Sequence, residues 1–285
     1  MLLKDFIRQT CESLEAVYPA QEARSIVSIY CADVLGVQSY THIVNPSTEI
    51  PGPMLARVLA DAADLSKGRP LQQVLGYAWF CERKFKVTPD VLIPRPETEM
   101  LVKLALEGLT DGAKVLDLCT GSGCIAWTLS LDAPGAYVTA VDISGKALDV
   151  AASQFDGRAP LFVEADILDP EWWKRSEGME EGSFDMILSN PPYIMESEKS
   201  DMRKNVLDFE PELALFVPDS DPLLFYKAIA HTARALLKRG GRGIVEINEA
   251  LGKETVSVFK AAGMSDIKII KDCYGKDRSI EFIRH

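Results

Sequence analysis

The chain has 285 residues, of which 47% are hydrophobic and 26% are charged, and its formal net charge at pH 7 is −11. This composition is typical of a globular protein that builds one large domain, or a small domain and a larger one. The acidic balance works against sequence-independent binding to a phosphate backbone, so it favours a protein or a small molecule as substrate over nucleic acid.

The sequence carries no recognisable targeting or metal-binding pattern. No apolar run reaches membrane-spanning length, and residues 1–5 lack a secretory signal pattern. The six cysteines form no Cys-x-x-Cys pair, and the three histidines are scattered along the chain. We therefore expect a soluble, cytoplasmic monomer without a metal site, a disulfide framework or a membrane partner.

Residues 1–70 are predicted to form a small helical domain. Apolar side chains recur there at helical spacing, and Lys67–Pro70 is a turn sequence that closes the segment. The pattern fits equally a packing extension of a main domain and a separate domain that recognises a partner. In residues 71–95, apolar residues alternate on both sides of the charged Glu82–Lys84, which predicts a β-hairpin linker.

Residues 96–285 show the alternation of strand and helix patterns that is typical of a doubly wound, mostly parallel sheet. The strand-like runs are 115–117, 137–141, 161–163, 184–188 and 243–247. Helices are expected to begin at residues 125 and 144, and another helix is expected after 247 and to end at residue 262. Two further runs, 267–270 and 280–283, predict an antiparallel pair at the C-terminal end. We expect the acidic stretch 166–181 to form a solvated loop and helix.

The sequence Asn190-Pro191-Pro192-Tyr193 directly follows the buried strand predicted at 184–188. Two consecutive prolines fix the backbone and remove two N–H donors, so the carbonyl groups at the strand end are left as acceptors. The Asn190 side chain adds another oxygen and Tyr193 adds a flat ring, so the turn can receive a planar NH2 group. An ordinary turn that closes a strand is the alternative. The pattern favours a binding site for an amide or an exocyclic amine.

A glycine-containing loop, Asp117–Ala126, lies between the first predicted strand of the sheet and its helix. Glycines allow the backbone to approach a ligand at the carboxyl ends of parallel strands. Asp142 ends the second strand, where a carboxylate can accept both hydroxyls of a ribose, and Asp166 ends the third strand in the same way. The sequence therefore predicts a nucleoside-containing ligand.

The loop also matches the Gly-x-Gly-x-x-Ala pattern of NAD-binding dehydrogenases, which is weak evidence by itself. A carboxylate as close to the loop as Asp117 disfavours a pyrophosphate and favours a cationic sulfonium ligand. No His or Lys is placed as an acid or base for hydride transfer, and a dehydrogenase has no use for the Asn-Pro-Pro-Tyr turn. These observations favour S-adenosylmethionine as the cofactor.

These motifs together resemble the HemK/PrmC family, the glutamine methyltransferases of peptide chain release factors. The resemblance extends over nearly the whole chain and rests on five segments: 117–123, 190–193, 210–215, 275–278 and Leu-Ile-Pro-Arg-Pro-Glu-Thr-Glu at 92–99, which is highly family-specific. It implies a class I S-adenosylmethionine-dependent methyltransferase fold preceded by a small helical domain. It also implies that the glutamine of a Gly-Gly-Gln motif in a release factor is the methyl acceptor. Because residues 1–70 carry helical faces but none of the cofactor motifs, we expect them to recognise this protein substrate.

The resemblance and the residue patterns together select the candidate site residues. The catalytic residues are expected to be Asn190, Pro191, Pro192 and Tyr193. The cofactor-binding residues are expected to be Asp117, Cys119, Thr120, Gly121, Ser122, Gly123, Asp142, Ile143, Asp166, Ile167 and Asn190. The expected reaction is in-line attack of a primary amide nitrogen on the sulfonium methyl group of S-adenosylmethionine, catalysed mainly by positioning. S-adenosylhomocysteine would be the product.

Two rival functions use the same residues. An adenine-N6 methyltransferase of nucleic acids has the same geometry at its target amine, but the net charge and the segment at 92–99 argue against it. A noncatalytic binding protein is less favoured because the Asn-Pro-Pro-Tyr turn is intact. The chain departs from the family where Cys119 replaces a glycine, where Ile167 replaces an aromatic residue of some members, and at Ile247–Glu249, which we expect to affect the sheet edge more than the chemistry.

Overall fold

The computed structural model describes residues 1–176 and 178–285 and divides the chain into two compact units. The first unit contains residues 1–78 together with 203–209, and the second contains residues 79–202 and 210–285. The helical unit is therefore longer than the expected 1–70, and it includes a segment from the middle of the chain. The physical reason lies in Leu71, which is buried in the helical core and holds the chain to this unit beyond residue 70.

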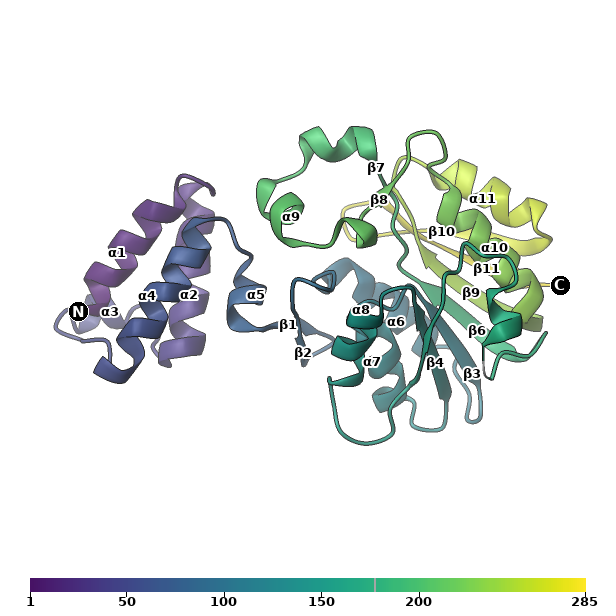
Figure 1. The fold of residues 1–285 in the computed structure, drawn as a ribbon, viewed down its shortest axis with the longest axis horizontal. Helices are drawn as coiled ribbons and strands as arrows, with labels where there is room; N and C mark the ends of the chain where they lie inside the picture. The colour runs from purple at the N-terminus through teal and green to yellow at the C-terminus, as the bar shows by residue number, and fades with distance from the viewer. Residues whose placement is uncertain (177) are drawn as a thin grey trace. The chain divides into compact units, whose positions relative to one another are not determined.

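Helices build the first unit. They are α1 (Leu3–Leu14), α2 (Ala20–Leu35), α3 (Thr41–Val44), α4 (Gly52–Ser66), α5 (Leu71–Leu75) and α9 (Lys204–Phe209). Those up to residue 75 are drawn in purple and blue in Figure 1, and α9, from the middle of the chain, is drawn in green. The core holds Phe6, Val27 and Tyr30, and the Tyr30 hydroxyl donates a hydrogen bond of 2.6 Å to Asp61. The Gln73 side chain donates a hydrogen bond of 2.8 Å to the Phe209 carbonyl, which attaches α9 to α5.

A hairpin joins the helical unit to the second unit along the chain. Its strands are β1 (Tyr77–Phe80) and β2 (Arg83–Lys86), within the residues 71–95 where a hairpin was predicted. Cys81 and Glu82 both have positive φ angles, of 45° and 62°, as both central residues of a type I′ turn require. Phe80 and Phe85 are fully buried in a hydrophobic core of the second unit, so the hairpin packs on that unit through its aromatic side chains.

The second unit contains a seven-stranded sheet in the order β5-β4-β3-β6-β9-β11-β10. Its strands are β3 (Lys114–Leu118), β4 (Tyr137–Asp142), β5 (Leu161–Glu164), β6 (Phe184–Ser189), β9 (Leu237–Glu246), β10 (Met264–Lys271) and β11 (Asp277–Arg284). Strands β3, β4, β5, β6 and β9 pair in parallel, and β11 pairs antiparallel with both β9 and β10. The predicted parallel sheet with an antiparallel C-terminal end is thus confirmed (Figure 1).

Helices cover both faces of this sheet because successive residues of a strand point to opposite sides. In β6, Met186 and Leu188 belong to the core on one face, whereas Ile187 belongs to the core on the other. The helices of this unit are α6 (Glu99–Leu106), α7 (Cys124–Asp132), α8 (Gly145–Ala152), α10 (Leu224–Leu236) and α11 (Gly252–Ala261). The core with Ile187 includes residues of α10 and α11, and the opposite core includes residues of α6 and α7.

Shorter elements complete the second unit. They are the 3₁₀ turns η1 (Pro96–Thr98), η2 (Trp172–Arg175), η3 (Glu196–Asp201) and η4 (Glu212–Ala214), and the two-residue strands β7 (Ile194–Met195) and β8 (Phe216–Val217). Most of the described residues in the acidic stretch 166–181 are exposed, as expected, but Ile167, Trp172 and Met179 are buried. Trp172 is buried against α10, where its ring nitrogen lies 3.3 Å from the Thr232 hydroxyl.

Candidate active site

A cavity lies at the carboxyl ends of β3, β4, β5 and β6, where open parallel sheets usually bind ligands. The empty space in it, including the part that is open to solvent, is about 830 Å³. The predicted site residues that line it are Cys119, Gly121, Asp142, Ile143, Asp166, Ile167, Asn190 and Pro192. Its other lining residues were not among the predicted site residues. Three of them, Leu92, Pro211 and Leu213, belong to the family-like segments, whereas Val91, Leu168 and Phe225 do not.

Asp142 stands at the end of β4 with its carboxylate held by the backbone of two loops. Its Oδ2 atom accepts a hydrogen bond of 2.8 Å from the Gly121 N–H, and its Oδ1 atom accepts one of 3.0 Å from the Ser144 N–H. Burial raises the pKa of Asp142 in spite of these two donors. Each carboxylate oxygen has a second acceptor position. Asp142 can therefore receive the two hydroxyls of a ribose without losing the contacts that orient it.

Asp117 is fully buried and does not line the cavity. Its Oδ2 atom accepts a hydrogen bond of 2.6 Å from the Thr120 hydroxyl, and burial raises its pKa to about 7. Thr120 and Ser122 are also buried, outside the lining of the cavity. Gly123 has a φ of 77°, and a Cβ atom there would lie 2.9 Å from the Ala151 Cβ. These four predicted cofactor-binding residues shape the glycine loop rather than line the cavity.

The electrostatic character of the cavity suits a cation. The described residues that line it include Asp90, Asp142 and Asp166, and no Lys or Arg side chain is among them. Apolar side chains, among them Ile143, Ile167 and the ring-bearing Phe225, complete the wall. A cavity lined by carboxylates and apolar side chains favours a sulfonium compound that carries a nucleoside over a pyrophosphate.

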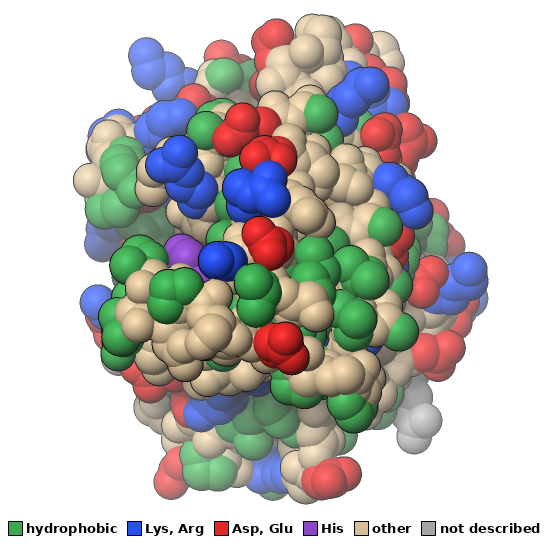
Figure 2. All heavy atoms as spheres, turned by 90° about the vertical axis from the view of Figure 1, so that its left-hand side faces the viewer, with side chains coloured by type: hydrophobic (Ala, Val, Ile, Leu, Met, Phe, Trp, Pro, Cys, Tyr) green, Lys and Arg blue, Asp and Glu red, His purple; other side chains and the backbone are tan. Residues whose placement is uncertain are grey.

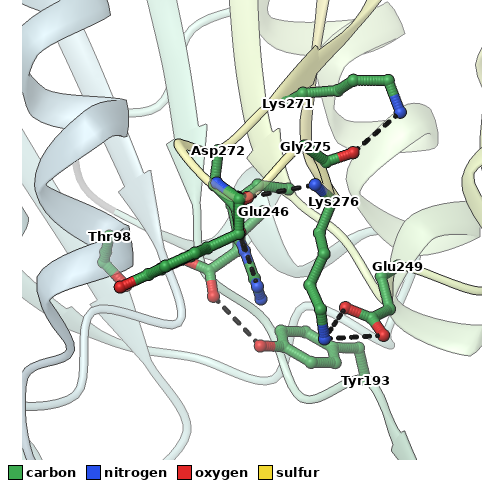
Figure 3. A network of polar contacts seen from close by, with 10 residues as sticks. Thr98, Tyr193, Glu246, Glu249, Lys271, Asp272, Gly275 and Lys276 are labelled. Carbon is green, nitrogen blue, oxygen red and sulfur yellow. Dashed lines mark hydrogen bonds and ion pairs between the residues drawn. The ribbon is translucent and has the colours of Figure 1, made fainter.

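Asn190 is held by a hydrogen-bonded chain that ends on a buried glutamate. Its Nδ2 atom donates to the Thr98 hydroxyl oxygen at 3.0 Å, and the Thr98 hydroxyl donates to Glu246 Oε2 at 2.8 Å. The Tyr193 hydroxyl donates to the other carboxylate oxygen, Oε1, at 3.0 Å (Figure 3). Since Nδ2 is occupied by Thr98, the Asn190 Oδ1 atom is left to accept a hydrogen bond in the cavity. Pro191 and Tyr193 themselves do not line the cavity.

The family-like segment at 92–99 meets the segment at 210–215 through an ion pair between a partly exposed arginine and a buried glutamate. Arg95 donates to Glu210 Oε1 at 2.6 Å, and the Ile93 N–H donates to Oε2 at 3.0 Å. The Glu210 side chain is only 1% exposed. This pair explains how Leu92 and Pro211, which are far apart in the sequence, come to line the same cavity.

Asn248 corrects one sequence-based expectation, because its side chain contacts the backbone of the Asn-Pro-Pro-Tyr turn. Its Nδ2 atom donates to the Tyr193 carbonyl and to Glu198 Oε2, each at 3.2 Å. Its backbone N–H donates to the Tyr226 hydroxyl at 2.9 Å. At Asn248, the departure from the family therefore touches the support of the active site and not only the sheet edge, whereas the Glu249 side chain is an exposed partner of Lys276.

Two negative findings apply to residues 1–176 and 178–285. No three His, Cys, Asp or Glu side chains there are grouped so that they could hold a metal ion. None of the helices in that part of the chain is both long enough and apolar enough to cross a membrane.

Comparison with known proteins agrees with this geometry. Residues 96–208 match the family model described as "Methyltransferase small domain". The chain is 41% identical to a release factor glutamine methyltransferase of Bacteroides thetaiotaomicron over 96% of both chains. It is 36% identical to a release factor glutamine methyltransferase of Flavobacterium psychrophilum over 99% of both chains.

A solved structure supports the fold alone. A methyltransferase from Pyrococcus furiosus superposes with a TM-score of 0.50, at 18% identity, over 81% of this chain and 98% of that one. The sheet order, the cavity at the strand ends and the identity over nearly the full length lead to one conclusion. The chain belongs to the release factor glutamine methyltransferase family and has the class I S-adenosylmethionine-dependent methyltransferase fold.

Proposed function

We propose that the protein transfers a methyl group from S-adenosylmethionine to the side-chain amide nitrogen of the glutamine in the Gly-Gly-Gln motif of peptide chain release factors. The observation that carries the proposal is the orientation of Asn190. Its nitrogen donates to Thr98, so its oxygen is the atom available to a substrate in the cavity. A primary amide supplies the donor that this oxygen needs.

The cofactor fits the residues that line the cavity. S-adenosylmethionine supplies an electrophilic methyl group on a positively charged sulfur. Asp142 would receive the ribose hydroxyls, and the apolar Ile143 and Ile167 would flank the adenine. The absence of Lys and Arg among the described lining residues supports a sulfonium compound over a dinucleotide, as does the carboxylate of Asp166.

The acceptor requires help because an amide nitrogen is a poor nucleophile. Its lone pair is conjugated with the carbonyl group. In the proposed geometry, Asn190 Oδ1 accepts one hydrogen of the target amide. The Pro191 carbonyl and the Tyr193 ring were expected to receive the second hydrogen and to hold the amide plane, but neither residue lines the cavity of the free protein, so the proposal depends on Asn190. Fixed acceptors favour the positive charge that develops on the nitrogen during transfer. Positioning of the nitrogen in line with the methyl group supplies the remaining catalysis.

The helical unit is our candidate for recognition of the release factor. Apolar side chains are exposed on its surface, including Ile43 at 69% and Val44 at 76%, and Tyr40 lies beside them in the sequence. Figure 2 looks onto the side of the molecule at the left of Figure 1 and shows hydrophobic side chains at the surface among charges of both signs. Exposed apolar side chains of this kind are common at protein contacts. We place the reaction in the cytoplasm, with a monomeric enzyme and without nucleic acid as a direct partner.

One experiment tests the proposed reaction directly. Purified release factor is incubated with the enzyme and isotopically labelled S-adenosylmethionine, and the methylated peptide is mapped by fragmentation mass spectrometry. We expect one methyl group on the glutamine of the Gly-Gly-Gln motif. Label on another side chain, or label only when a nucleic acid is supplied, would contradict the proposal.

A further inference from the structure

Glu246 is a buried carboxylate that touches neither the cavity nor the proposed substrate. It ends β9, is 2% exposed, and accepts hydrogen bonds from Thr98 and Tyr193 on its two oxygens. Thr98 in turn accepts from Asn190. Figure 3 shows Glu246 between Thr98 and Tyr193. The expected site residues included only the two ends of this network, Asn190 and Tyr193.

The charge of Glu246 determines the direction of the whole network. An ionised carboxylate only accepts hydrogen bonds, so the Thr98 hydroxyl must donate its single hydrogen to it. The Thr98 oxygen can then only accept, and the neighbouring Asn190 amide must turn its NH2 group toward it. This leaves the Asn190 oxygen for the substrate.

A neutral hydrogen-bonding group in place of the carboxylate permits the opposite direction. It can donate to Thr98, the Thr98 hydroxyl can then donate to the Asn190 oxygen, and the Asn190 NH2 group turns toward the substrate. Both arrangements have the same shape, because the two ends of a carboxamide are nearly equal in size. Only the arrangement with an ionised carboxylate presents an acceptor to the target amide. In the reversed arrangement, the Asn190 NH2 group and the NH2 group of the target amide are both donors and cannot bond to each other.

We propose that Glu246 is a positioning residue, whose negative charge, relayed through Thr98, makes Asn190 present its oxygen to the methyl acceptor. The inference rests on the proposed function for its catalytic consequence. The direction of the hydrogen bonds follows from the ionised carboxylate of Glu246 and from its contacts in the free protein, and it does not depend on that function.

The surroundings of Glu246 act on its charge in both directions. Burial raises its pKa above the ordinary value, and Glu97 adds to this effect. The hydroxyls of Thr98 and Tyr193 and the charge of Arg278, which is paired with Asp272 at 3.0 Å, lower it. The Tyr226 hydroxyl is a further titratable group in this environment, and burial raises the pKa of that tyrosine, with a smaller contribution from the negative charge of Glu246. Protonation of Glu246 therefore begins at a higher pH than for an exposed glutamate, and the acceptor orientation is lost as the pH falls through that pKa.

Glu246→Gln is a nearly isosteric test, and Tyr193 predicts its outcome. If the new amide turns its oxygen to Thr98, its NH2 group faces the Tyr193 hydroxyl, whose hydrogen then has no acceptor. If it turns its NH2 group to Thr98, Tyr193 keeps its acceptor and Asn190 is reversed. A buried hydroxyl without an acceptor is unfavourable enough to select the reversed state by about 10- to 100-fold. We expect single-turnover methyl transfer to slow by that factor, with KM for the release factor and cofactor affinity little changed.

The same substitution should be nearly harmless to the rate when Tyr193 is already Phe. Without the tyrosine hydroxyl, the two orientations of the new amide each lose one partner, so both are populated. Glu246→Gln should then slow transfer only about twofold relative to Tyr193→Phe alone. Thr98→Val should slow transfer strongly, and Thr98→Ser should be far less impaired. Glu249→Gln, on the exposed carboxylate that pairs with Lys276 at 2.9 Å, is the matched control and should keep the wild-type rate.

Two measurements decide the inference. The first is the rate of transfer against pH at saturating cofactor, in which the wild type should lose activity toward acidic pH and Glu246→Gln should lack the part of that fall caused by Glu246. A wild-type rate in Glu246→Gln would overturn the inference. So would a finding that Glu246→Gln slows transfer by the same factor in the wild-type background and in the Tyr193→Phe background.

The second measurement does not depend on activity. The side-chain NH2 signals of Asn190 in nuclear magnetic resonance should shift with pH in the wild type and be displaced in Glu246→Gln. If the chemical shifts of these signals change neither with pH nor with the substitution, the inference is also overturned. This result holds even if the variant folds too poorly for its kinetics to be interpreted. Failure of the wild type to methylate release factor would instead reject the proposed function, and the Asn190 signals would still decide the direction of the network.

Discussion

Gly121 and Asp142 are joined by a hydrogen bond of 2.8 Å from the Gly121 N–H to the Asp142 carboxylate. This bond attaches the glycine loop after β3 to the end of β4. The loop and the carboxylate are therefore a single preformed surface for the nucleoside part of the cofactor.

Asp142→Ala should weaken S-adenosylmethionine binding by roughly 1.5–3 kcal/mol, because hydrogen bonds to a charged group are lost. Burial raises the pKa of Asp142, so binding by the wild type should also weaken as the pH falls through that pKa. Calorimetry measures both effects. Asp149→Ala, an exposed acid of α8, is the control and should bind normally. Tight NAD binding without S-adenosylmethionine binding would reject the cofactor assignment.

Asn190→Ala should reduce the single-turnover rate of methyl transfer by about 100- to 1,000-fold, the usual cost of losing one preorganised polar partner. The two prolines remain, so the turn should keep its backbone. Cofactor affinity, measured on the same preparation, should fall far less. A wild-type transfer rate in this variant would mean that the reaction occurs elsewhere.

Arg95→Ala should lower the free energy of unfolding by about 1.5–3 kcal/mol, since it leaves the buried Glu210 carboxylate without its cation. Urea denaturation of the full chain measures this loss. The double variant Arg95→Ala with Glu210→Gln should recover part of the stability, because the buried group is then neutral. An equal or larger loss in the double variant would show that the pair acts through packing rather than charge.

Asp117→Asn should stabilise the cofactor-free protein near neutral pH by a few kcal/mol. Burial raises the Asp117 pKa to about 7, so the folded chain keeps a proton that the unfolded chain has released. The corresponding stability is present below about pH 4 and is lost as the pH rises through about 7. Denaturation of both proteins across this range should show curves that separate with rising pH. If the difference in free energy of unfolding between the two proteins is the same at every pH, the raised pKa of Asp117 is contradicted.

Ile43→Asp and Val44→Asp together should lower kcat/KM for full-length release factor by about tenfold, as expected for loss of an apolar contact. Transfer to a short peptide that contains Gly-Gly-Gln should be unaffected. Leu131→Asp places the same change on an exposed apolar side chain of the second unit and is the control. Equal losses on the peptide and the protein would reject recognition by the helical unit.

The sequence predicted the sheet well because its strands are short apolar runs separated by turn residues. Helix α10 was not predicted, although Tyr226, Ile229 and Ala233 lie at helical spacing and are buried. The helical spacing of apolar residues is present in this segment, but polar residues that face away from the core lie between them and make the spacing harder to recognise.

The active site was only partly predictable for a different reason. Asn190 and Asp142 are marked by local motifs, whereas the partners of Asn190 come from remote segments. Thr98 is 92 positions from Asn190, and Glu246 is 53 positions from Tyr193. No local pattern carries such contacts, since they exist only once β6 and β9 are adjacent. Asp117 was misplaced for another reason. It belongs to a local motif, but the motif does not show that its side chain is buried and does not line the cavity.

The inclusion of residues 203–209 in the helical unit has a consequence for synthesis of the protein. The ribosome makes more than a hundred residues between Ala78 and α9, which takes roughly ten seconds at usual elongation rates. During that time the emerging helices lack α9, and four parallel strands of the second unit are made before the first unit is complete. A nascent chain stalled before residue 203 should therefore expose the surface that α9 covers. A truncation that starts at Leu71 keeps α5, to which Gln73 attaches α9, but removes Glu22, which pairs with Arg203. Point substitutions are therefore the cleaner way to separate the two units.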